Sequence, residues 1–307
     1  MTRAAASAAS SVAARALASV FGAALLLGGC SSMERAFGGG SASSPVSSKP
    51  PSLGFMSSTA RPDFNQDVSS QFNPDAPEDP LVYLREAAEE ATRARQPLAA
   101  ATHWSSITRA QPENMEATYQ LGRHLRLLGR NEEAERALRA GLRAAPRDPR
   151  FAQELGKTLA ADGRPEEAVT VLEQALAQGQ DGPDLRSALG AAYDYAGRHA
   201  EARPHHDRAV ALAPHDAAVL NNAGLSQAMG GDLPGAEKTL RAALGAPEAD
   251  ARVRQNLALV LSLQGDSAGA ERLLRRDLAR ADADRTLAFY RSLVDQPDAW
   301  GAIRRSN

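Results

Sequence analysis

One repeat period dominates this 307-residue chain and limits the folds open to it. From residue 81 onward, residues of one type return every 34 positions, without insertion, through six units. Four independent series share that register: Leu-Gly or a similar small pair at 121–122, 155–156, 189–190, 223–224 and 257–258; glycine at 129, 163, 197, 231 and 265; alanine at 100, 134, 168, 202, 236 and 270; and a mostly large residue at 104, 138, 172, 206, 240 and 274. A fixed period of this length indicates an array in which neighbouring units bury each other's apolar faces.

Each series has a structural reason that points to a helix–turn–helix unit. The small residue at the eighth position lets two helices approach closely. The glycine at the fifteenth ends the first helix in a left-handed conformation. Proline, asparagine or serine shortly after this turn suits the start of a second helix. The alanine at the twentieth position allows helices to cross, and the leucines at the twenty-fourth fill the core between units.

This pattern resembles the tetratricopeptide repeat (TPR). The resemblance implies an all-α, right-handed solenoid of six units, at 81–114, 115–148, 149–182, 183–216, 217–250 and 251–284. The first unit departs from the pattern, with Ala87-Ala88 in place of Leu-Gly and Arg95 in place of the turn glycine. Terminal units of repeat arrays are often atypical. The fourth position, large in the family, is weak here, which predicts a thinner core.

The segment "RTLAFYRSLV", residues 285–294, follows the sixth unit. Its apolar residues Leu287, Tyr290, Leu293 and Val294 share one helical face. Because a solenoid exposes its last apolar face, we expect residues 285–307 to form a capping helix and a tail. A helix that docks onto a partner is the alternative.

The first 29 residues predict a secretory signal. Arg3 and Arg15 supply positive charge, no acidic residue precedes Glu34, and residues 16–29 are apolar and small. This apolar stretch is too short to span a bilayer, which takes about 20 residues.

The signal ends in Leu27-Gly28-Gly29-Cys30, which resembles the bacterial lipobox. The resemblance implies cleavage before Cys30 and acylation of that residue, and several acyl chains give stable anchoring where one does not. Cys30 is the only cysteine, so no internal disulfide can form. Ser31, by resemblance to sorting in Gram-negative bacteria, implies the periplasmic face of the outer membrane. The alternative is an ordinary secretory signal with an incidental cysteine.

Residues 30–80 predict a lipid-anchored, disordered linker. The stretch "GGGSASSPVSSKPPS" has almost no apolar content, and "NPDAPEDP" closes the segment with prolines and acids. Such a segment cannot bury enough surface to offset its chain entropy. The alternative is a loop loosely attached to the repeats.

Composition and motifs argue against several functions. Lysine plus arginine number 35 and aspartate plus glutamate 37, with a pI near 6.3 and no basic run, so we expect no nucleic-acid partner. No catalytic constellation is recognisable, and we expect neither an enzyme nor a small-molecule substrate. The six histidines lack the spacings of zinc sites, so we expect no metal and no cofactor beyond the lipid on Cys30. Only His206 lies on the core register, and the other histidines are expected at the surface.

The remaining functional surface is the concave groove, which in this repeat family is built by positions 2, 5, 9, 12 and 13 of the first helices. In units one to three these positions give Arg85, Arg93, Arg123, Arg126, Arg150 and Lys157 against Glu89 and Glu116, with Tyr119. In units four to six they give Arg252 against Asp184 and Asp194, with Tyr195, Asn221, Leu225, Met229, Leu259 and Leu263. The pattern predicts a groove that is basic in its N-terminal half and apolar in its C-terminal half. We expect it to hold a peptide or helix with an acidic end and a hydrophobic end. The alternative is a merely solvated face.

Residues 110–294 resemble one group of lipid-anchored TPR proteins. The stretches "NNAGLSQAMGGDLPGAEKTLRAAL", "RVRQNLALVLSLQGDSAGAERLLRRDL" and "AFYRSLV" are similar to the TadD-type lipoproteins of tight-adherence (Tad, or Flp) pilus assembly. The resemblance implies a scaffold or pilotin-like role that helps an outer-membrane secretin assemble. Two alternatives stay open: an adaptor for peptidoglycan hydrolases or for β-barrel assembly, and a cryptic enzyme.

Overall fold

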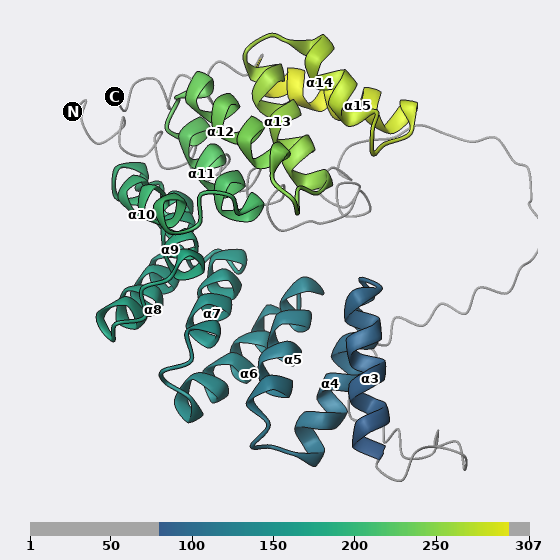
Figure 1. Cartoon of the computed structure of the whole chain (residues 1–307), viewed down its shortest axis with the longest axis vertical. Helices are drawn as coiled ribbons and strands as arrows, with labels where there is room; N and C mark the ends of the chain where they lie inside the picture. The colour runs from purple at the N-terminus through teal and green to yellow at the C-terminus, as the bar shows by residue number, and fades with distance from the viewer. Residues whose placement is uncertain (1–79, 295–307) are drawn as a thin grey trace, which may run out of the picture.

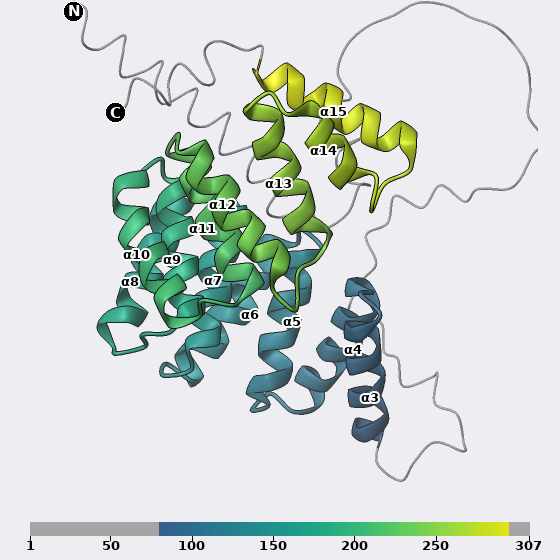
Figure 2. The same ribbon diagram turned by 45° about the horizontal axis from the view of Figure 1, so that its top comes forward.

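The computed structural model describes residues 80–294, and within them it contains thirteen α-helices and no strand. The helices are α3 (Pro80–Arg93), α4 (Pro97–Ala110), α5 (Met115–Leu127), α6 (Asn131–Ala144), α7 (Pro149–Ala161), α8 (Pro165–Ala177), α9 (Pro183–Tyr195), α10 (His199–Leu212), α11 (Ala217–Met229), α12 (Leu233–Gly245), α13 (Ala251–Leu263), α14 (Ser267–Leu274) and α15 (Arg280–Val294). Figure 1 shows them paired in sequence along an arc from α3 to α15, and Figure 2 shows the same stack turned by 45° so that its top comes forward. The predicted all-α solenoid is confirmed.

Residues 1–79 and 295–307 lie outside the described part of the chain. The expected signal peptide, Cys30, the linker and the C-terminal tail therefore stay predictions. None of the described helices combines the length and the apolar character that crossing a membrane requires.

The turn inside each unit forms as the sequence predicts. Glycines at the fifteenth position of units two to six adopt positive φ, from 72° at Gly129 to 91° at Gly265. Arg95, which replaces this glycine in unit one, adopts the same left-handed region at φ 54°. A residue with a Cβ pays a steric cost of roughly 1–2 kcal/mol there, so the first turn is strained where the other five are not.

Close helix approach explains the small residue at the eighth position. A Cβ added to Gly122 would lie 2.6 Å from the Leu138 side chain, and one added to Gly156 would lie 2.6 Å from that of Leu172. The alanines at the twentieth position are all fully buried. The residues at the twenty-fourth are also buried, including Trp104 and His206. The register thus places the core between the helices of each pair and between successive units.

The fourth position contributes unevenly to that core. Thr118, Ala152 and Leu220 are buried, but Arg186 and Arg254 form ion pairs instead. Only units one and five have a large apolar side chain, a leucine, at this place where the repeat family has one.

The C-terminal end differs in its boundaries from the sequence expectation. Helix α14 ends at Leu274 after eight residues, and α15 begins at Arg280 rather than at residue 285. Asp277 in the intervening turn binds Arg254 of α13 at 2.6 Å and so fixes the turn. Leu287 and Tyr290 are buried against α13 and α14, which places α15 over the last apolar face of the array.

Candidate partner-binding groove

The first helices of successive units form one continuous inner wall. Helix α5 contacts α7, α7 contacts α9, α9 contacts α11, and α11 contacts α13. All the predicted groove residues lie on these five helices except those of unit one, such as Arg85, which lie on α3. Residues on this wall therefore either face the groove or pack against the neighbouring first helices.

The basic half of the wall is more neutral than its sequence predicts. Arg126 binds Glu154 at 2.5 Å, and Lys157 lies 3.5 Å from the other oxygen of the same carboxylate. Glu154 is almost fully buried. Burial alone raises the pKa of this carboxyl, but Arg126, Lys157 and Arg123 hold the pKa below its ordinary value. Glu154 lies at the sixth position of its unit, which the groove pattern leaves out, so the sequence prediction missed it.

A second cluster surrounds Arg150. Its guanidinium binds Glu116 of the preceding unit at 2.6 Å and Asp148 at 2.8 Å. It also stacks 4.9 Å from the centre of the Tyr119 ring, an arrangement that favours a cation over the aromatic face. Arg150 thus links two units and is already satisfied electrostatically.

Arg123 and Arg85 form no ion pair with any of the described residues. Arg123 is half-buried on α5, next to the Arg126–Glu154 pair, and Arg85 is exposed on α3. Of the residues predicted to make the groove basic, these two are the ones available to an acidic ligand.

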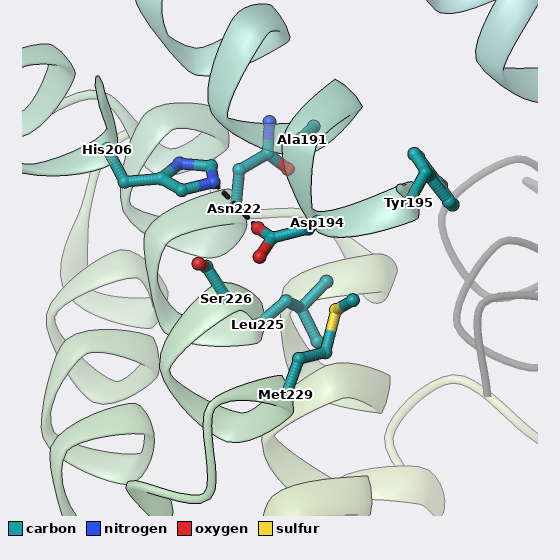
Figure 3. A pocket seen from close by; sticks show the side chains of 8 residues that line it. All are labelled: Ala191, Asp194, Tyr195, His206, Asn222, Leu225, Ser226 and Met229. Carbon is teal, nitrogen blue, oxygen red and sulfur yellow. Dashed lines mark hydrogen bonds and ion pairs between the residues drawn. The ribbon is translucent and has the colours of Figure 1, made fainter. Parts of the chain in front are cut away.

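The C-terminal half of the wall contains a small cavity of about 10 Å³ between α9 and α11. Figure 3 shows the side chains that line it: Ala191, Asp194, Tyr195, His206, Asn222, Leu225, Ser226 and Met229. The volume is about that of one water. Four predicted groove residues, Asp194, Tyr195, Leu225 and Met229, are thereby brought together.

Most of these side chains are nevertheless buried. Leu225, Met229 and Leu259 are at most 6 % exposed, because adjacent first helices pack on them, and Leu263 is partly buried against the same core. The apolar half is therefore largely a helix–helix contact, in which Tyr195 and Leu263 are only partly buried.

Asp194 is also buried and is bonded to two histidines. Its carboxylate oxygens lie 2.8 Å from His199 Nδ1 and 3.0 Å from His206 Nε2. Burial raises the pKa of Asp194, but these two hydrogen bonds hold it below its usual range. Burial and the neighbouring Asp194 carboxylate raise the pKa of Tyr195 well above its ordinary value.

Asparagines form links between units at the same wall. Asn256 Nδ2 donates to Asn221 Oδ1 at 2.8 Å, and Asn222 Nδ2 donates to Ser187 Oγ at 2.9 Å. Asn221, predicted as a groove residue, is 7 % exposed, and its side-chain oxygen accepts the hydrogen bond from Asn256. The amide groups of Asn222 and Asn256 thus have structural partners.

The histidines are less exposed than expected. His206 occupies the core register as predicted, but His124 is also buried, at 4 % exposure, and His205 stacks on the Tyr193 ring at 5.4 Å. The expectation of surface positions was wrong for His124, because its side chain faces α3 and contacts Thr92 there. Within residues 80–294 no group of three or more histidine, cysteine, aspartate or glutamate side chains is placed to hold a metal ion.

Comparison with known families settles the nature of the array. Profiles of the tetratricopeptide repeat match residues 85–149, 119–185, 154–217 and 187–252, and another profile of that description matches 251–276. The chain belongs to the tetratricopeptide repeat family. A search of curated proteins gave no match.

Two solved TPR structures share the fold. TTC0263, a thermophilic TPR protein of Thermus thermophilus, is 20 % identical with a TM-score of 0.55, and the match covers 59 % of this chain and 99 % of that one. PilW, described as a widely conserved type IV pilus biogenesis factor, is 16 % identical with a TM-score of 0.55 and coverages of 69 % and 99 %. At these identities the similarity establishes the TPR fold.

Proposed function

We propose that this protein is a lipid-anchored TPR scaffold that helps the secretin of a tight-adherence (Flp) pilus assemble at the periplasmic face of the outer membrane. Membership of the TPR family carries the scaffold part, because these repeats generally bind protein partners and lack catalytic machinery. The inner wall of first helices supplies the extended surface that such binding uses.

The anchor rests on the sequence Leu27-Gly28-Gly29-Cys30. Acyl chains on Cys30 would hold the chain at the membrane, and residues 30–80 would separate the repeats from the lipid. A scaffold held in this way needs no cofactor.

The pilus assignment rests on the resemblance of residues 110–294 to the TadD-type lipoproteins. PilW, which has the same fold, is itself described as a pilus biogenesis factor. The alternative is a lipid-anchored adaptor for peptidoglycan hydrolases or for β-barrel assembly, which the same anchor and the same repeats would serve.

Affinity capture from cell envelopes separates these functions. The wild-type chain is expected to retain a secretin, and Cys30→Ala is expected to lose it together with membrane fractionation. Recovery of cell-wall hydrolases without a secretin would reject the pilus assignment and favour the alternative.

The groove has its own test. Arg123→Glu combined with Arg85→Glu reverses the two basic side chains that lack carboxylate partners, and we expect it to weaken capture of an acidic partner segment. Arg126 is unsuitable for charge reversal because it compensates the buried Glu154. Arg136→Glu combined with Arg143→Glu is the matched control, since both arginines are exposed on the second helix α6. Equal capture by all three chains would remove the groove from the proposal.

A further inference from the structure

A second concave feature lies away from the groove, between the second helices of units five and six. It is a cleft of about 160 Å³ lined by Arg241 of α12, Arg272 of α14 and Arg276 in the turn after α14. Leu261 of α13 and Leu273 of α14 supply its apolar lining. The predicted groove residues of α13, Leu259 and Leu263, do not line it.

The cleft carries an excess of positive charge. Arg241 pairs with Glu237 on its own helix at 2.6 Å, whereas Arg272 and Arg276 form no ion pair with any residue of the described chain. Asp266 is the only acidic residue in the lining, and its Oδ1 accepts a hydrogen bond from the Gly269 backbone N–H at 2.8 Å. Three cationic side chains thus face one carboxylate that already caps α14.

The repeats themselves show that this arrangement departs from the rest of the array. In units two to four, an arginine at the sixteenth position pairs with a glutamate at the nineteenth: Arg130–Glu133, Arg164–Glu167 and Arg198–Glu201. Two of these arginines also bind a glutamate of the preceding unit's second helix, as in Arg164–Glu135 at 2.6 Å and Arg198–Glu166 at 3.2 Å.

In units five and six the two positions are aspartate and glycine instead. Asp232 and Asp266 cap their helices by accepting from the N–H of Gly235 and Gly269. In units two and three, Arg139 also lies 3.9 Å from Glu167, the nineteenth residue of the next unit. Arg241 is the equivalent of Arg139 in unit five, and Gly269 takes the place of that glutamate in unit six, so Arg241 lacks this second carboxylate. The arginines that line the cleft remain.

We propose that this cleft binds a phosphoryl group. Three guanidinium groups from separate positions suit a tetrahedral oxyanion, because each planar fork can donate two hydrogen bonds to a pair of phosphate oxygens. A planar carboxylate, by contrast, needs only one guanidinium group to form hydrogen bonds with both of its oxygens. The group could come from free phosphate or from the headgroup of an anionic phospholipid.

The test compares the full chain with two double variants. Arg272→Gln/Arg276→Gln removes the two unpaired cations of the cleft. Arg136→Gln/Arg143→Gln is the matched control, since it removes the same charge from exposed positions on α6. Inorganic phosphate is titrated by calorimetry, and vesicles of phosphatidylcholine with and without phosphatidylglycerol are tested by co-sedimentation. The N-terminal segment is identical in all three chains, so differences between them report the repeats.

We expect the cleft variant to lose at least tenfold in affinity for one of the two probes and the control to lose less than twofold. Loss for inorganic phosphate identifies a free-phosphate site, and loss confined to phosphatidylglycerol vesicles identifies a headgroup site. The proposal is overturned if the wild-type chain binds neither probe, or if both double variants lose affinity equally, which would indicate general charge attraction.

Discussion

His124 gives the array a dependence on pH that can be calculated from its surroundings. The ring is buried between α3 and α5, and Nε2 lies 3.1 Å from Thr92 Oγ1. Because the Thr92 hydroxyl donates to the Ala88 carbonyl at 2.7 Å, its oxygen must accept from the Nε2–H of a neutral imidazole. The remaining nitrogen, Nδ1, has no partner among the described residues. Protonation would place an unpaired N–H and a full charge in this site.

The expected loss in the free energy of unfolding follows from the lowered pKa of His124. Burial, assisted by the positive charges of Arg123 and Arg126, lowers the pKa of His124 from 6.5 to about 4. The unfolded chain therefore binds more protons than the folded chain as pH falls from about 6.5 towards 4, so stability decreases on acidification. Between pH 7 and 5 the free energy of unfolding should fall by about 2 kcal/mol through this residue alone.

Urea unfolding followed by circular dichroism at pH 7 and pH 5, at constant ionic strength, measures this effect. His124→Gln keeps a group that can bond to Thr92 but cannot titrate, and it should lose about 2 kcal/mol less than the wild type over the interval. His215→Gln is the control, because His215 is exposed, and its loss should match that of the wild type. If His124→Gln loses as much stability as the wild type does, the ring is not held neutral and the reasoning fails.

Three further predictions concern the first turn, the helix packing and a buried ion pair. Arg95→Gly should raise the free energy of unfolding by about 1 kcal/mol because it relieves the left-handed backbone of the first turn, and an unchanged urea midpoint would contradict this. Gly141→Ala should cost about 1–3 kcal/mol because a Cβ there meets a buried ring. Gly245→Ala, where nothing lies within 4 Å of the added Cβ, should be neutral or stabilising, and thermal melts of the two variants measure the difference. Glu154→Gln should cost about 3 kcal/mol by leaving a buried cation uncompensated, whereas the half-exposed Glu116→Gln should cost under about 1 kcal/mol; similar losses would show that Glu154 is solvated.

The parts of the fold that depend on one unit or one helix pair could be predicted from the sequence. The turn glycines, the small eighth residue and the buried alanines follow from the repeat register, because each acts within about 20 residues. Arg95 is an example: the register assigns residues 81–114 to a helix–turn–helix unit, and the backbone turns at Arg95 although glycine is absent there.

The candidate site was harder to predict, because it depends on how the units stack. Glu154 meets Arg126 across 28 residues and from a different helix, at a position that a count of groove charges leaves out. Leu225 and Met229 belong to the groove by register, yet the neighbouring first helices bury them. Gly141 illustrates the same limit, since only the placement of Phe151 from the next unit explains it.

The change from arginine–glutamate pairs in units two to four to aspartate caps in units five and six divides the array mechanically. Added salt screens the partly exposed ion pairs that join the second helices of units two to four. It has less effect on the hydrogen bonds from backbone N–H groups to the Asp232 and Asp266 carboxylates, which act within single helices. Higher ionic strength should therefore loosen the contacts between the second helices of units two to four, whereas within residues 80–294 no ion pair joins α12 to α14 and so none there can be screened.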